Sequence, residues 1–303
     1  MEVAFKRIRR NWQLYLLFLP PLAYVLVFNY YPMYGAQIAF KDFNAVQGIW
    51  GSDWVGLKHF EQFVQSYEFW RVMRNTLLLS LYSLLVGFPF PIILALGLNY
   101  ASNRFFKRTV QMVTYAPHFI SVVVIVGLMS QLLNPRLGVV NRILEVLGYE
   151  AINFMGKPEL FKTLYVLSDV WQNVGFACII YLAALSGIDP AQHEAAIMDG
   201  GSIPRRMWHI DLPGIMPVAV IIFILGMGGI LSTGFEKVLL MQNPLNYQTS
   251  EVIDTYVYKV GLVSVMPNYS YSTAIGLFKS LIGLVLLIGV NRFAKKINQE
   301  SLW

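Results

Sequence analysis

The chain has 303 residues, of which 56% are hydrophobic and only 13% are charged, and its mean hydropathy is +0.53. A soluble domain carries about twice that share of charge, so the composition indicates an integral membrane protein and excludes an ordinary soluble domain. The net charge of +6 at pH 7 could suggest nucleic-acid binding, but its distribution over the loops explains it better. A single cysteine, Cys178, excludes a disulfide framework.

Six apolar runs are long enough to cross a bilayer, which takes about 20 helical residues. We therefore predict an all-α, polytopic membrane protein with six transmembrane helices in a single domain over residues 1–303. The run near the N-terminus follows basic residues, as in a signal peptide, but it is too long and carries Pro20-Pro21, so we interpret it as a retained span. The predicted spans cover residues 14–33, 75–100, 110–133, 163–187, 215–235 and 271–291.

The charges in the loops predict the orientation of these spans. If both termini are cytoplasmic, the inner segments hold 12 Lys and Arg in 59 residues, whereas the outer segments hold 10 in 105. The density of basic residues is then about twice as high inside, as the positive-inside rule expects. After the acidic residues are subtracted, the inner segments carry the whole excess of +6. We therefore predict that both termini lie in the cytoplasm.

The most informative stretch is polar and lies between the fourth and fifth predicted spans, at residues 188–213. Asp189 can cap a helix whose first turn holds Pro190, and Gly200-Gly201 can end that helix in a left-handed turn. Ser202 can then cap a second short helix. A helix-turn-helix of this length cannot span a bilayer, so we predict that it lies at the membrane surface.

This segment resembles the EAA signature of binding-protein-dependent ABC importer permeases, where it forms the coupling helix that docks on a cytoplasmic ATPase. An ordinary surface helix would explain the Glu-Ala-Ala triplet alone, but not the Asp-Gly and Leu-Pro pairs at these spacings. Gly201 stands where many relatives have Ala, and Trp208 where many have Phe. The resemblance implies ATPase coupling by Glu194, Ala195, Ala196, Asp199, Gly200, Leu212 and Pro213.

A second set of motifs narrows the resemblance to the maltose-type sugar permeases and their large-oligosaccharide subgroup. These motifs are Tyr31-Pro32-Met33-Tyr34-Gly35, Ala39-Phe40-Lys41-Asp42 and Trp54-Val55-Gly56-Leu57. The resemblance implies the type I permease fold of ABC importers, the bacterial cytoplasmic membrane, and alternating access for a sugar, expected to be an oligosaccharide. Its implied partners are two cytoplasmic ATP-binding subunits, a second, non-identical permease and an extracytoplasmic solute-binding protein.

Catalysis by this chain is not expected. No G-x-x-x-x-G-K-[ST] motif occurs, and the four histidines fall in unrelated segments without metal-ligand spacing. We therefore expect no cofactor and no metal in this chain, with ATP and Mg bound by the partner ATPase, and no nucleic-acid partner.

Polar side chains in the fourth span are candidate contacts with the cargo, because burying them in lipid is costly. Asp169, Gln172, Asn173 and Phe176 share one helix face, and acids, amides and a ring suit a sugar. Hydrogen bonding between helices is the alternative. The resemblance to maltose-type permeases, matched by distance from Glu194, implies a substrate path through three spans: His118, Ser121, Asp169, Asn173, Gly229, Thr233 and Glu236.

One intramembrane ion pair is also predicted. Lys279 in the sixth span and Asp169 in the fourth lie at similar depth, at about 1.5 Å per residue. We expect them to pair, which would reduce the cost of burying either charge, and the alternative is that Lys279 snorkels to the interface. The same two charges leave open a second function, an ion-gradient-driven secondary transporter, although that class does not need the coupling segment. A non-transporting scaffold would have no reason to line a span with polar groups.

Overall fold

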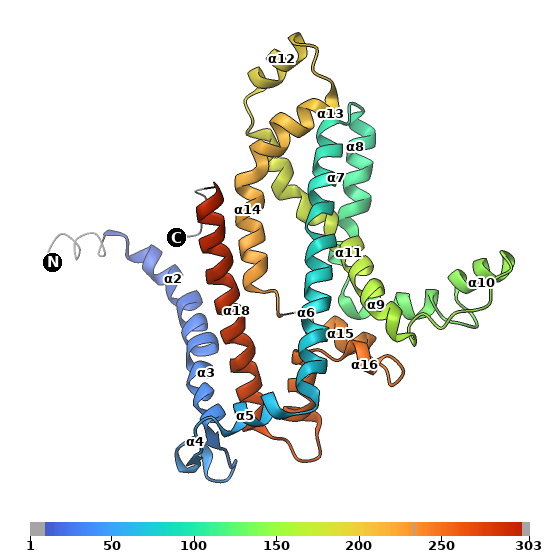
Figure 1. The fold of residues 1–303 in the computed structure, drawn as a ribbon. Helices are drawn as coiled ribbons and strands as arrows, with labels where there is room; N and C mark the ends of the chain where they lie inside the picture. The colour runs from blue at the N-terminus through green and yellow to red at the C-terminus, as the bar shows by residue number, and fades with distance from the viewer. Residues whose placement is uncertain (1–9, 233, 299–303) are drawn as a thin grey trace. The chain divides into compact units, whose positions relative to one another are not determined.

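The computed structural model describes residues 10–232 and 234–298, and nearly all of its regular structure is helical (Figure 1). The chain divides into two compact units. Unit 1 comprises Met1–Ser66 and Val257–Phe278, and unit 2 comprises Tyr67–Tyr256 and Lys279–Trp303. Among the described residues, five helices are long and apolar enough to cross a membrane, or six if one sharply bent pair counts as a single crossing. The predicted all-α, polytopic fold class is confirmed.

Unit 1 joins the first crossing to a small module rich in aromatic residues. The crossing is a helical run from Trp12 to Phe40, and none of the residues in its most apolar stretch is buried. Phe40 stacks on the Trp54 ring with the two ring centres 5.7 Å apart. The elements are α2 (Trp12–Val25), η1 (Leu26–Tyr30), α3 (Tyr31–Met33), η2 (Tyr34–Phe40), β1 (Lys41–Asp42), α4 (Gly48–Gly51), β2 (Asp53–Trp54), α5 (Lys58–Gln65), η5 (Lys259–Val263) and the start of α18 (Tyr269–Asn298).

The two short strands of unit 1 pair antiparallel, with Lys41 opposite Trp54. The Lys41 ammonium donates to the carbonyl of Ile49 at 2.7 Å, and a ring nitrogen of His59 lies 3.1 Å from the carbonyl of Lys41. The Phe63 ring of α5 meets the Tyr271 ring of α18 edge-on, with centres 6.3 Å apart. These contacts hold the module to the first turns of α18.

Unit 2 carries the remaining crossings and both candidate sites. The helices α6 and α7 form one candidate crossing, Glu68–Tyr100. The elements are α6 (Glu68–Gly87), α7 (Pro89–Tyr100), α8 (Arg104–Tyr115), η3 (Ala116–Phe119), α9 (Val122–Leu132), α10 (Val139–Val146), α11 (Pro158–Ser186), α12 (Pro190–Met198), α13 (Ile203–Arg206), η4 (Met207–Asp211), α14 (Leu212–Gly228), α15 (Phe235–Met241), α16 (Tyr247–Ser250), α17 (Ile253–Tyr258) and the rest of α18.

The third predicted span, residues 110–133, is not one continuous helix. The pair Arg104–Phe119 and Val122–Leu132 is bent by 103°. Ile120 and Ser121 between them are extended, with ψ of 131° and 150°, and the Ser121 hydroxyl caps α9 by accepting from Val124 N at 3.4 Å. Pro117 tightens the preceding turn. The span was predicted from the length of its apolar run alone. That criterion does not register the bend at Ile120 and Ser121, where a new helix begins.

The fifth crossing is displaced from the prediction of 215–235. Counted with α13 and η4, it covers Ile203–Gly228. Gly228 and Gly229 end it, because glycine is among the poorest helix formers. The other predicted spans agree with the candidate crossings of the structure to within a few residues, except that the first and second crossings begin or end several residues further out.

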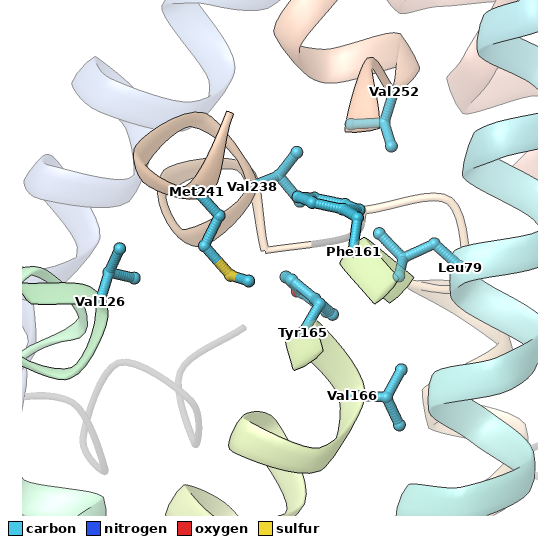
Figure 2. Close-up of a cluster of buried hydrophobic side chains, with 8 residues drawn as sticks. All are labelled: Leu79, Val126, Phe161, Tyr165, Val166, Val238, Met241 and Val252. Carbon is cyan, nitrogen blue, oxygen red and sulfur yellow. The ribbon is translucent and has the colours of Figure 1, made fainter. Parts of the chain in front are cut away.

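Two apolar clusters hold unit 2 together, and α11 belongs to both. Gly175 lets α11 approach α8 closely, since a Cβ there would overlap the backbone carbonyl of Thr114. One cluster joins α6, α9, α11 and α15 (Figure 2): Leu79, Val126, Phe161, Tyr165, Val166, Val238, Met241 and Val252. The other packs α7 against α11 and α14: Ala95, Leu98, Cys178, Tyr181, Leu185, Ile215 and Ala219.

Within unit 2, the segment α12–α13 lies at one end of the helices, beside the end of α7, whereas α15 and α16 lie at the opposite end (Figure 1).

Candidate functional site

The segment between α11 and α14 folds into two short helices, as predicted. The Asp189 carboxylate caps α12 by accepting a hydrogen bond from Ala191 N at 2.9 Å. The helix ends in a Schellman turn, in which Gly200 has φ of +75° and the N–H of Gly201 donates to the Ala196 carbonyl at 2.7 Å. Glycine at residue 200 is thus required by the backbone.

Most of the predicted coupling residues are exposed on α12 or at its C-terminal end. No residue of α12 is buried, and Ala196 is half-buried. Leu212 and Pro213 begin α14, directly after the π-helical segment η4. An exposed helix that presents apolar and acidic side chains together offers a surface to a partner protein. The exposed edge of α12 comprises Glu194, Ala195, Ile197, Met198, Asp199 and Gly200.

The second candidate site is a cavity of about 420 Å³ between α6, α11 and the end of α14. Asp169 and Gly229, both predicted for the cargo path, line it. The lining also includes four residues with hydroxyl groups that sequence analysis did not select: Ser80, Ser83, Tyr165 and Ser232. A carboxylate among hydroxyl groups can exchange hydrogen bonds with a polyhydroxylated ligand.

The Asp169 carboxylate is the centre of a polar chain through three elements. Its Oδ1 accepts from Asn173 Nδ2 at 3.2 Å and lies 3.5 Å from Lys237 Nζ. The Asn173 Oδ1 lies 3.0 Å from His118 Nδ1, and the His118 ring stacks on Phe176 with centres 4.0 Å apart. The structure therefore connects three other predicted residues, Asn173, His118 and Phe176, to Asp169 in one chain of contacts.

Lys237 is a site residue that sequence analysis missed. Its side chain is only 4% exposed, whereas that of Asp169 is 42% exposed. Burial lowers the pKa of the Lys237 ammonium, and the Asp169 carboxylate acts in the opposite direction. The ammonium also lies 4.9 Å from the centre of the Tyr165 ring. The sequence analysis placed Lys237 in an outer loop, where a lysine is expected to be exposed to solvent and so does not indicate a buried site.

The predicted ion pair between Asp169 and Lys279 is wrong. Lys279 Nζ lies 2.5 Å from Asp254 Oδ1, and Asp169 pairs with Lys237 instead. The prediction compared only charged residues within the apolar runs. The actual partners, Lys237 and Asp254, lie in the polar stretch between the fifth and sixth spans. That stretch folds back against the spans and supplies the counter-charges.

The other residues predicted for the path have separate positions. Gln172 is buried and donates to the Ile120 carbonyl at 3.0 Å, which is the bond between helices that was the alternative to cargo contact. Ser121 caps α9, and Glu236 is exposed in the first turn of α15. Thr233 lies outside the described residues.

These features define a class, a multi-pass membrane protein with a cavity among its spans and a surface helix at one end. Residues 87–299 match the family described as binding-protein-dependent transport system inner membrane component. The chain is 43% identical to Protein LplB of Bacillus subtilis (strain 168), over 98% of this chain and 92% of that protein. It is 45% identical to the polygalacturonan/rhamnogalacturonan transport system permease protein YteP of the same strain, over 100% and 93%.

Solved structures give the same answer. A bacterial ABC transporter involved in the import of the acidic polysaccharide alginate is 39% identical, with a TM-score of 0.89 over 97% of this chain and 99% of that chain. A second structure, the alginate transporter in complex with its alginate pentasaccharide-bound periplasmic protein, is 38% identical with a TM-score of 0.90 over 98% and 99%. The chain belongs to the binding-protein-dependent transport system inner membrane components. The predicted family, fold and role as an ABC importer permease subunit are confirmed.

Proposed function

We propose that this chain is a permease subunit that carries an acidic oligosaccharide into a bacterial cell through the cavity at Asp169. The relatives named for polygalacturonan and for alginate support an acidic sugar as cargo. The cavity supports it as well, because Lys237 neutralises Asp169 and leaves a neutral, hydroxyl-lined cluster. An unpaired carboxylate in the cavity would repel a uronate.

ATP drives this transport through α12, which docks on one of two cytoplasmic ATPase subunits. The observation that carries this part is the exposed edge of α12 beside Glu194, on a helix with no buried residue. The ATPases bind ATP and Mg, and this chain is non-catalytic. The excess of basic residues in the inner segments supports a cytoplasmic location for α12 and for both termini.

Two further partners complete the importer. A solute-binding protein delivers the sugar to the outer face, as the family's description and the alginate complex suggest for related systems. A second, non-identical permease packs beside this chain in the bilayer. The first crossing, whose apolar stretch has no buried residue, offers side chains to lipid and to that second permease.

Uptake into proteoliposomes containing the assembled importer tests the coupling site. Glu194→Lys combined with Gly200→Trp should remove both uptake and co-purification of the ATPase. A matched control, Glu150→Lys, reverses an exposed charge in the loop after α10 and should retain both. If the first variant keeps uptake and ATPase attachment, or if uptake follows an ion gradient without ATP, the proposed function is wrong.

A pair of trisaccharides tests the cargo. Trigalacturonate and its carboxyl-reduced neutral counterpart have the same length and linkage and differ only in charge. We expect trigalacturonate to stimulate ATP hydrolysis in the presence of the binding protein and the reduced sugar to fail. Stimulation by the neutral sugar alone would contradict an acidic cargo while leaving the role as permease intact.

A further inference from the structure

A buried carboxylate lies at the joint between the coupling segment and the fifth crossing. Asp211 is the last residue of η4, and none of its surface is exposed. The Tyr100 hydroxyl donates to its Oδ2 at 2.6 Å. Its Oδ1 has no hydrogen-bond partner, although His193 Nε2 lies only 3.3 Å away. A buried carboxylate with one unsatisfied oxygen is costly unless a positive charge is close.

Three elements meet at this carboxylate. Tyr100 is the last residue of α7, His193 belongs to α12, and Arg206 ends α13. The Tyr100 ring lies 5.4 Å from the Arg206 guanidinium carbon, and its centre is 6.5 Å from that of the His193 ring. The ionisable groups facing Asp211 are therefore Tyr100 and His193, with Arg206 across the tyrosine ring.

The contact with His193 matters because α12 has little else to hold it. No residue of α12 is buried, and on its inner side only His193 and Ala196 are half-buried. A helix without a packed face would tilt under load before it moved the spans. His193 is also the neighbour of Glu194, so any force applied at the exposed edge reaches it directly.

The load has a route beyond Asp211. Tyr100 ends α7, and the apolar cluster above it packs Leu98 of α7 against Leu185 of α11 and Ile215 of α14. The π-helical segment η4 joins Asp211 to α14, and such segments occur often at functional sites. A displacement of His193 would thus reach three crossings through one carboxylate.

We propose that His193, Asp211 and Tyr100 form a strut that fixes the coupling helix to the membrane-spanning core. This inference rests on the proposed function, since it concerns how force from the ATPase enters the spans. His193 is a positioning residue. Its Nε2 lies 3.3 Å from the unsatisfied Oδ1, so a small reorientation of the ring would complete a hydrogen bond to that oxygen.

The strut makes the coupling of ATP hydrolysis to transport depend on the contact between His193 and Asp211. Without that contact α12 has no tie to the buried carboxylate, because the Tyr100 hydrogen bond joins Asp211 only to α7. Two properties should therefore fall together when the contact is removed. These are the protection of the α12 amides against hydrogen exchange and the stimulation of ATP hydrolysis by the sugar-loaded binding protein.

The experiment uses the assembled importer in nanodiscs, with trigalacturonate as the probe. At one fixed pH, the protection of residues 190–198 should be about fivefold lower in His193→Ala than in the wild type, the size expected of one polar contact. Stimulation should fall with it. His193→Lys, which places a cation beside Oδ1, should restore both.

The control is His209→Gln, which removes another histidine of the same segment, one that contacts the Arg205 carbonyl instead. It should keep the protection and the stimulation of the wild type. Unchanged protection in His193→Ala overturns the strut. Lower protection without a matching loss of stimulation overturns the positioning role. Loss of ATPase co-purification in the wild type would instead overturn the proposed function, whatever the exchange shows.

Discussion

Replacement of Asp169 by asparagine should destabilise unit 2, because it leaves the buried ammonium of Lys237 facing a neutral amide. Removing one partner of a fully buried ion pair costs about 3–5 kcal/mol. Here the Asp169 side chain is 42% exposed and the two charges are 3.5 Å apart, so water screens the pair. The Tyr165 ring, 4.9 Å from Nζ, also retains an attraction for the ammonium. We therefore expect a loss of about 1–2 kcal/mol.

The double variant Asp169→Asn with Lys237→Met provides the decisive comparison. Lys237→Met removes the buried charge, so the double variant should be about as stable as Lys237→Met alone. The coupling energy between the two sites should be about 1–2 kcal/mol, which corresponds to about 2–8 °C in Tm for a chain of this size. Tryptophan fluorescence during heating of the assembly in nanodiscs measures it.

A second pair serves as control. Asp254→Asn combined with Lys237→Met should be additive, because Asp254 pairs with Lys279 and not with Lys237. The reasoning is refuted if the double variant of Asp169 and Lys237 is no more stable than Asp169→Asn alone.

Four further predictions concern other parts of the chain. Because burial lowers the pKa of Lys237, the cost of its buried charge is full below the folded-state pKa and is relieved as pH rises through it. Tm should therefore rise between neutral pH and the ordinary lysine pKa in the wild type, and less in Lys237→Met. Gly175→Ala should cost about 1–3 kcal/mol, since its Cβ would overlap the Thr114 carbonyl, whereas Gly97→Ala, with open space around it, should change the same Tm measurement by about 1 kcal/mol or less. Asn141→Ala removes side-chain bonds to Ile152 N and O at 2.7 and 3.0 Å, so limited proteolysis should cut the α9–α11 loop faster. Gly200→Ala forces alanine to φ near +75°, at a cost of about 1–2 kcal/mol, and hydrogen exchange should show fraying at the end of α12.

The coupling segment could be predicted from the sequence because its signals are local. The helix cap at Asp189 and the left-handed turn at Gly200 each depend only on residues a few positions away in the chain. The structure forms both. The crossings are likewise local properties of apolar runs. Family resemblance then added the partner that such a segment would meet.

The ion pairs could not be predicted, because they depend on how polar loops return to the spans. Lys237 and Asp254 both lie in the stretch that was expected to be outer loop, and each provides the counter-charge for a residue in a span. Hydrophobic periodicity places residues on faces and at depths, but it does not say which loop covers them. The buried Asp211 was missed for the same reason, since its partner Tyr100 ends another crossing.

The sharp bend after η3 has a consequence for how the bilayer can be traversed at that place. The legs on either side, 16 residues in α8 with η3 and 11 in α9, reach about 24 and 16 Å, each short of the hydrocarbon thickness of about 30 Å. The bend at Ile120 and Ser121 interrupts the backbone hydrogen bonds of the helix, and the hydrocarbon of the bilayer offers no groups that could replace those hydrogen bonds. The Gln172 amide of the neighbouring α11 supplies one such bond, to the Ile120 carbonyl, at the place where the helical ladder is interrupted.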